Sequence, residues 1–132
     1  MTYRPSETER SLAAGLQLAS IFFFFLPALI VLQTRWRESP YIQLWAKANL
    51  IWSLFLIVPA LTLFLLDWIV GANDVYIVVW CAHTMMVIVC AFASMFNRPI
   101  GYFIITRRYC SAEMAGVFGA ALAPDLGKKQ AE

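Results

Sequence analysis

Three long runs of uncharged, mostly apolar residues alternate with short polar segments along this chain of 132 residues. The runs cover Ser11–Gln33, Ala48–Leu66 and Val75–Phe96, which are 23, 19 and 22 residues long. A helix rises about 1.5 Å per residue, and the hydrocarbon core of a bilayer is about 30 Å thick, so runs of this length suit membrane crossing. The pattern predicts an all-α integral membrane bundle of three transmembrane helices.

Prolines and turn residues set the expected limits of these helices. Pro27 lies inside the first run, where it predicts a kink. Ser39 is suited to cap a helix and Pro40 to occupy its first position, so the second helix is expected to begin there and to enter the membrane at about residue 48. Residues 67–74 read as a short acidic turn, and Pro99 is expected to end the third helix.

The pattern changes after the third run. Ile100–Ile105 is too short to span and is followed by two arginines. Ser111–Leu122 has apolar residues at helical spacing, which predicts a short C-terminal interfacial helix on the membrane surface or against the bundle. No repeat or linker divides the chain, so we expect a single transmembrane domain over residues 1–132.

The composition supports lipid as the surrounding solvent. Hydrophobic residues make up 61% of the chain and charged residues 14%, whereas soluble domains carry about 25% charged residues. A soluble fold this short could not bury so much apolar area. The net charge of +2 and the absence of a basic run argue against a nucleic-acid partner. Membrane lipids and other integral membrane proteins, or further copies of the chain, are the expected partners.

The distribution of Lys and Arg predicts an orientation. With three spans, eight basic residues follow the first or third run and two lie in the N-terminal segment, while the 67–74 turn has none. The positive-inside rule then predicts an N-terminus outside and a C-terminus in the cytoplasm. Six of the eight form a basic cytoplasmic collar, which serves as a topology signal that attracts anionic lipid or as a docking surface: Arg35, Arg37, Lys47, Arg98, Arg107 and Arg108.

Aromatic residues gather near the expected helix ends, where their rings are suited to the headgroup layer. We expect them to form the interfacial belts of the bundle: Trp36, Tyr41, Trp45, Trp68, Tyr76, Trp80, Tyr102 and Tyr109.

His83 is the one histidine of the chain and lies inside the third run. An ionisable residue within a membrane helix is a functional candidate, here as a haem or pigment ligand or a proton relay. A neutral histidine can instead hydrogen-bond across a helix interface. One histidine cannot supply both axial ligands of a b-type haem, so the structural role is favoured and no cofactor is expected.

Weakly polar residues form stripes on each of the three expected helices. His83, Cys90 and Ser94 share one face, which could meet Gln17 and Ser20 of the first helix. Asn49 and Ser53 form a similar pair at the start of the second. Because small and weakly polar residues allow close approach and cross-helix hydrogen bonds, these stripes are expected to pack the bundle or to contact a partner rather than to line a substrate path.

The region from residue 9 to 50 carries a family resemblance. Its segments are Glu9-Arg10, Leu12-Ala13-Ala14, the loop Glu38-Ser39-Pro40-Tyr41-Ile42 and Ala46-Lys47. The chain thus resembles small bacterial membrane proteins of the DUF4870 type, which are similar to the chloroplast Tic20 import component. A weaker match to the basic, proline-containing segment of that family follows at Arg98-Pro99 and Tyr102–Tyr109.

The chain departs from that pattern at three positions. Trp45 stands where the family has a histidine, Gln17 or a neighbour stands for the histidine of the first helix, and Asn49 is shifted. The resemblance implies a fold more than an activity, and it favours a translocation-related or complex-accessory role.

No hydrolase, metalloprotease or nucleotide-binding motif is present, and no paired carboxylates lie within a helix. We therefore expect a non-enzymatic protein, first an accessory or scaffold subunit of a larger inner-membrane complex. The alternative is an oligomeric transport or protein-translocation component, in which Gln17, Asn49 and His83 would line a wet path. A haem or pigment holder using His83 is the third possibility.

Overall fold

The computed structural model describes residues 3–71, 74–98, 100–102 and 109–118, and all secondary structure in these ranges is helical. The all-α class expected from the sequence is therefore confirmed. The elements in chain order are α1 (Glu7–Phe23), α2 (Leu26–Gln33), the 3-10 turn η1 (Arg35–Glu38), α3 (Pro40–Val70), α4 (Asp74–Met95) and α6 (Ser111–Phe118).

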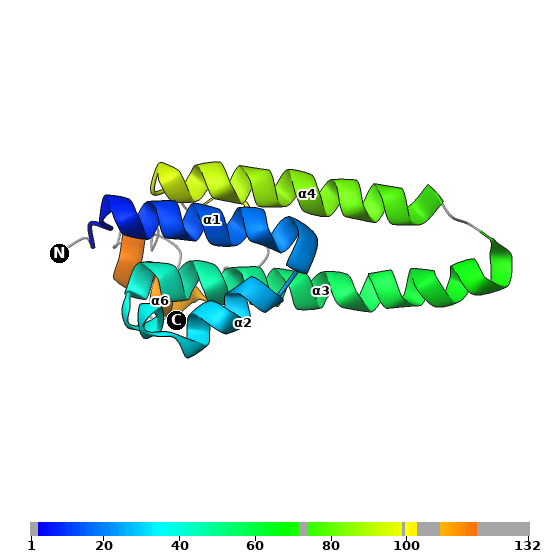
Figure 1. The fold of residues 1–132 in the computed structure, drawn as a ribbon, viewed down its shortest axis with the longest axis horizontal. Coiled ribbons are helices and arrows are strands. Elements are labelled where there is room, and N and C mark those ends of the chain that lie inside the picture. Colours follow the sequence, from blue (N-terminus) through cyan, green and yellow to red (C-terminus); the bar gives the residue numbers. More distant parts are fainter. Residues whose placement is uncertain (1–2, 72–73, 99, 103–108, 119–132) are drawn as a thin grey trace, which may run out of the picture.

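The first apolar run is broken into two helices. α1 ends at Phe23, Phe24 adopts a positive φ of 50°, and Pro27 is the second residue of α2. Proline lacks an N–H, and its ring would clash with the carbonyl four residues earlier, which is that of Phe23. α2 then returns toward the end of the molecule where α1 began (Figure 1). The continuous helix expected over Ser11–Gln33 is wrong, because the chain forms a helical hairpin there.

Two helices, and not three, are long and apolar enough to cross a membrane among the described residues: Pro40–Ile69 within α3 and Tyr76–Met95, which is most of α4. Their 30 and 20 residues correspond to about 45 and 30 Å. The second predicted span lies within the first of these helices, and the third, Val75–Phe96, matches the second to within one residue at each end. Ser39 caps α3 with Pro40 at its start, as expected. The three-span bundle is not confirmed.

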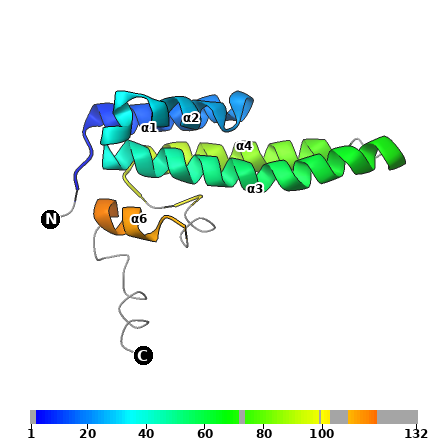
Figure 2. The ribbon, with the colours of Figure 1, turned by 90° about the horizontal axis from the view of Figure 1, so that it is seen from below.

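The helices form layers in one half of the molecule. The α1–α2 hairpin lies on one side of α3 and α4, and α6 lies on the other side (Figure 2). The half of α3 and α4 beyond the hairpin is covered neither by the hairpin nor by α6 (Figures 1 and 2).

α6 packs against the first part of α3 through the buried residues Met114 and Val117. An ion pair fixes it there, with 2.7 Å between Lys47 Nζ and Glu113 Oε1, and this hydrogen bond lowers the pKa of Glu113. Of the two positions expected for the interfacial helix, the structure has the one against the bundle. Residues 119–122 of the predicted helix lie outside the described residues.

The N-terminal segment is joined to the turn that follows the hairpin. Glu9 accepts hydrogen bonds from the Tyr3 hydroxyl at 2.6 Å, from the Ser6 backbone N–H at 2.7 Å and from the Ser39 hydroxyl. Burial acts to raise the pKa of Glu9, but these hydrogen bonds outweigh it and lower that pKa. At the same end, Arg10 donates to the Met95 carbonyl at 3.4 Å. The beginnings of α1 and α3 and the end of α4 therefore lie together.

We call this the basic end, because the segments with the described Lys and Arg residues lie there, namely the N-terminal segment, η1, the start of α3 and the end of α4 (Figure 1). These residues are Arg4, Arg10, Arg35, Arg37, Lys47 and Arg98. Arg107 and Arg108 of the predicted collar lie outside the described residues. The prediction of an N-terminus on the side opposite to the 34–39 loop is wrong, because it assumed that the first run crosses the membrane once. The opposite end of the molecule, where α3 ends and α4 begins, is called the far end below.

The short segment after α4 folds back into the bundle. Gly101 has a φ of +87°, and a Cβ added there would lie 2.2 Å from Cys90 Sγ. The next backbone N–H, of Tyr102, donates to the same sulfur at 3.2 Å, and the Tyr102 side chain is fully buried. Glycine is required here both by the backbone conformation and by the close approach to α4.

The hairpin predicts a specific membrane topology. Cysteines introduced one at a time at Glu7 and Glu38 should react with a membrane-impermeant maleimide from the same side of sealed vesicles. The background chain has Cys81 replaced by alanine, and its remaining cysteines, Cys90 and Cys110, are buried. A cysteine at Gly71, at the far end, should react only from the other side. Labelling of Glu7→Cys and Glu38→Cys from opposite sides would show that the first run crosses the membrane.

Gly101→Ala should lower the thermal unfolding midpoint of the detergent-solubilised protein by several degrees, because the new Cβ meets Cys90 and the positive φ is strained. Gly15→Ala is the matched control: it lies inside α1, and nothing lies within 4 Å of the added Cβ. That variant should be neutral or more stable, because alanine favours a helix. Equal midpoints for the two variants would contradict the close packing of Gly101.

Candidate functional site

The weakly polar residues of the three apolar runs meet inside the bundle. The structure brings together residues from α1, α3 and α4, each with no exposed surface: Gln17, Ser20, Asn49, Ser53, His83, Cys90 and Ser94. We call this set, together with Trp52 and Tyr102, the polar core. It lies where the hairpin packs against α3 and α4, since α1 contacts both long helices.

His83 links the hairpin to both long helices. Its Nδ1 lies 3.1 Å from Trp52 Nε1 on α3, and its Nε2 lies 3.1 Å from the Ser20 carbonyl on α1. An indole N–H can only donate, so Nδ1 accepts and the ring proton is on Nε2, which donates to Ser20. The ring of Phe24 stacks on His83 at 4.9 Å between centroids. His83 is thus a neutral histidine with both nitrogens in use.

Asn49 is the centre of the remaining hydrogen bonds. Its Nδ2 lies 3.0 Å from Gln17 Oε1, 3.0 Å from Ser20 Oγ and 3.1 Å from the Tyr102 hydroxyl. Two hydrogens serve three oxygens, so at least one hydrogen is shared. Burial raises the pKa of Tyr102, which keeps its hydroxyl neutral. Asn49 therefore ties α3 to α1 and to the segment after α4.

The other two members on α4 contribute to packing. Cys90 Sγ accepts the backbone N–H of Tyr102, and Ser94 Oγ donates to the Ala91 carbonyl of its own helix at 2.8 Å. The Ser94 carbonyl in turn accepts the hydroxyl of Tyr41, which is buried at the start of α3. These contacts join α4 to α3 near the basic end.

Sequence reasoning missed the aromatic members of the polar core. Trp52 and Tyr102 supply hydrogen bonds to His83 and Asn49, and Tyr41 and Trp45 are also fully buried. Tyr41, Trp45 and Tyr102 were expected in interfacial belts, so that part of the prediction is wrong. A signal existed for Trp52, which lies three residues after Asn49 and hence on the same helix face. None existed for Tyr102, because its position depends on the chain folding back at Gly101.

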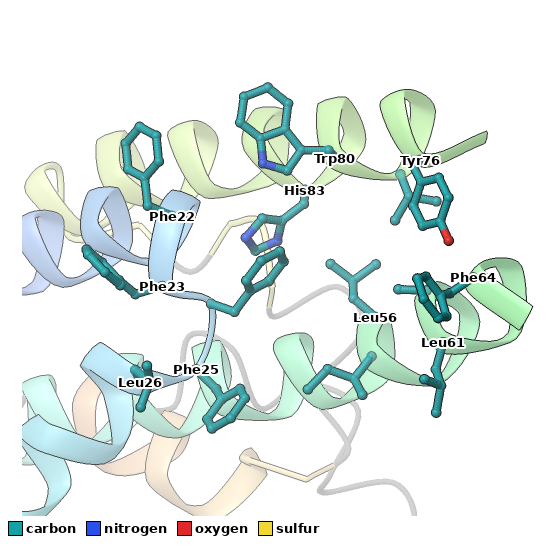
Figure 3. Close-up of a pocket in the computed structure, with 14 residues that line it drawn as sticks. Phe22, Phe23, Phe25, Leu26, Leu56, Leu61, Phe64, Tyr76, Trp80 and His83 are labelled. Carbon is teal, nitrogen blue, oxygen red and sulfur yellow. The ribbon is translucent and has the colours of Figure 1, made fainter. Parts of the chain in front are cut away.

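An apolar groove of about 770 Å³ begins where the polar core ends (Figure 3). Its inner end is formed by the hairpin tip, Phe22–Leu26, and by His83. Its walls are the far halves of α3 and α4, which carry Leu56, Phe64 and Trp80 among other apolar residues. The groove exists because the hairpin fills the space between α3 and α4 only as far as Phe24.

The polar core is poorly suited to chemistry. Coordination of a haem iron or metal by His83 would require it to give up its hydrogen bond to Trp52 or to Ser20. Within the described ranges no group of three His, Cys, Asp or Glu residues lies close enough to hold a metal ion. The arrangement instead joins α1, α3 and α4 through hydrogen bonds inside an apolar bundle, although Gln17 Nε2, Asn49 Oδ1 and Ser53 Oγ have no partner among the described residues. It is therefore a structural device.

Comparisons with known proteins add no family to this description. No protein-family model matches the chain, and neither a curated protein nor a solved structure matches it.

Asn49→Ala should destabilise the protein by about 1–3 kcal/mol, because it leaves buried oxygens of Gln17, Ser20 and Tyr102 without their donor. Ser53→Ala is the matched control, since Ser53 is equally buried one turn later on α3 and its Oγ has no hydrogen-bond partner among the described residues. It should change stability by less than about 0.5 kcal/mol. Denaturant unfolding in mixed micelles measures both. A larger loss for Ser53→Ala would contradict the role of Asn49.

Proposed function

We propose that this protein is a non-enzymatic accessory or scaffold subunit that packs against larger integral membrane proteins or against copies of itself. One observation carries the proposal. The polar core is enclosed within a single chain, whereas the outer faces of the long helices are mostly apolar, with exposed residues such as Leu54, Val58, Val78 and Phe92. Such a surface works through contact with lipid and with other helices.

The state of the polar core favours this function over transport. A wet path lined by Gln17, Asn49 and His83 needs these side chains to meet water, yet none of them has exposed surface. Their mutual and neighbouring hydrogen bonds would have to open before a path could form. The oligomeric transport component therefore remains the second candidate, without a structural feature in its favour.

The non-enzymatic part of the proposal is supported by the same geometry. His83 has both ring nitrogens engaged, so it has no free position from which to act as a base or a ligand. Ser20 and Ser94 donate to backbone carbonyls of their own helices. A nucleophile paired with a base is therefore not found among these side chains.

The charge distribution supports an orientation with the basic end in the cytoplasm. By the positive-inside rule, the end that carries Arg10, Arg35, Arg37 and Arg98 stays inside. The N-terminal segment is joined to that end by Glu9, so we place it in the cytoplasm as well. The far end, with Asp67, would then face outward. The resemblance to DUF4870 proteins stays a prediction, and it is the argument for a bacterial inner membrane.

A photocrosslinking experiment tests the scaffold function. Benzoylphenylalanine at Leu54 or Phe92, exposed on α3 and α4, should form discrete protein adducts when native membranes are irradiated, because a partner helix covers part of this surface. The same variants reconstituted alone in pure lipid are the control, and there only adducts between copies can form. A monomer that yields no protein adduct from either position, in membranes or in mild detergent, would contradict the proposal.

A further inference from the structure

The apolar groove beyond the hairpin tip is about one leaflet deep. Along α4 it extends over the eight residues from Tyr76 to His83, and along α3 over the nine from Leu56 to Phe64. These spans correspond to about 10–12 Å of helix, compared with about 15 Å for half of a hydrocarbon core. A helix that crosses the whole bilayer would not fit, because the inner end of the groove is closed by His83 and Phe24, which stack on each other.

The lining of the groove is suited to hydrocarbon. Phenylalanine, leucine and other apolar side chains form it almost entirely, and those at its rim are partly exposed, such as Phe22 at 74% and Phe64 at 58%. Its volume of about 770 Å³ lies within the range of roughly 300–1,000 Å³ that is usual for apolar ligands. In a membrane, the molecules that surround this opening are lipids.

The far end of the groove has a different chemistry. Tyr76 lines the groove, and Asp67 follows Phe64 by three residues, so it lies one turn beyond the lining on the same face of α3. Asp67 Oδ1 and the Tyr76 hydroxyl are both shielded from solvent and have no hydrogen-bond partner among the described residues. The ring of Phe64 lies 6.4 Å from that of Tyr76, which places Tyr76 opposite the last turns of α3, where Asp67 lies. A carboxylate acceptor beside aromatic rings is a combination that binds an ammonium group.

Charge balance points the same way. The described Lys and Arg residues belong to the basic end, so Asp67 has no basic side chain near it within the described part of the chain. A buried or half-buried carboxylate oxygen without a partner is costly. A cation supplied from outside the chain would satisfy it, whereas an anionic headgroup would be repelled.

We propose that the groove binds a phospholipid with a primary-ammonium headgroup, with an acyl chain along Phe22–Phe25 and the ammonium group at Asp67. The ammonium donates N–H bonds to the orphaned Asp67 oxygen, and the Tyr76 hydroxyl donates to a phosphate or ester oxygen of the same lipid. The lipid completes the half of the bundle that the hairpin does not reach. This inference does not depend on the scaffold function, because the isolated chain contains the whole site.

Native mass spectrometry of the purified full chain tests the proposal with two probes that share the same acyl chains, phosphatidylethanolamine and phosphatidylglycerol. The wild-type protein should retain one phosphatidylethanolamine, with a preference over phosphatidylglycerol of roughly tenfold in apparent Kd. Asp67→Asn should reduce that preference to less than about twofold. Glu38→Gln, which removes an exposed carboxylate at the basic end, should leave it unchanged.

A second pair of variants separates the acyl site from the headgroup site. Ala60→Trp places an indole in the groove and should weaken retention of both lipids, whereas Thr62→Trp, on the exposed side of α3 and outside the groove, should not. Circular dichroism shows whether each variant is folded; if Ala60→Trp is not, Asp67→Asn still decides. Equal retention of both lipids by the wild type, or a second protein copy in place of lipid, would overturn the proposal.

Discussion

The hydrogen bond between His83 and the Ser20 carbonyl lies at the point where α1 ends inside the apolar part of the bundle. The last carbonyls of a helix have no partner within it, and in lipid no water can supply one. The Ser20 carbonyl accepts both the Phe24 N–H, at 2.9 Å, and the His83 ring N–H. Since Trp52 donates to the other nitrogen of the ring, a single imidazole joins the hairpin to α3 and α4. The depth to which the hairpin enters the bundle is set there.

The unequal halves of the molecule follow from this constraint. On the side of the basic end, the space between α3 and α4 is filled by the hairpin from one face and by Tyr102 and α6 from the other (Figure 2). Beyond Phe24 nothing in the described part of the chain fills it, and the groove results. The cross-helix hydrogen bonds of the polar core lie in the closed half, although Gln17 Nε2, Asn49 Oδ1 and Ser53 Oγ have no partner among the described residues. In the open half, Asp67 Oδ1 and the Tyr76 hydroxyl lack such partners as well. The hydrogen-bonded half holds the fold together, and the open half is available for binding.

The outcome for the helices shows what an apolar run can and cannot specify. α3 begins at Pro40 because the capping serine and the proline act locally, and α4 ends near the expected limit for the same reason. The first run has the length and hydropathy of a membrane-spanning helix. Hydropathy does not show whether such a run crosses the membrane or turns back on itself. Pro27 predicts a kink from the sequence, but the chain reverses direction there. The effect of a proline depends on which hydrogen-bond partners the freed backbone groups find, and the sequence does not show these partners. The Ser20–His83 contact joins residues 63 positions apart, which no local pattern reveals.

The sequence by itself determined the helical class, the two long spans, the cap at Ser39 and the membership of the buried polar set, because these depend on composition, on local stereochemistry and on which residues share a helix face. The tertiary structure decided how those faces are used. It turned the first run into a hairpin, brought the N-terminal segment to the basic end through Glu9, and moved Trp52 and Tyr102 into the polar core. It also left the groove open at the far end. Each of these depends on contacts between residues distant in sequence, where the need to satisfy buried polar groups selects the arrangement.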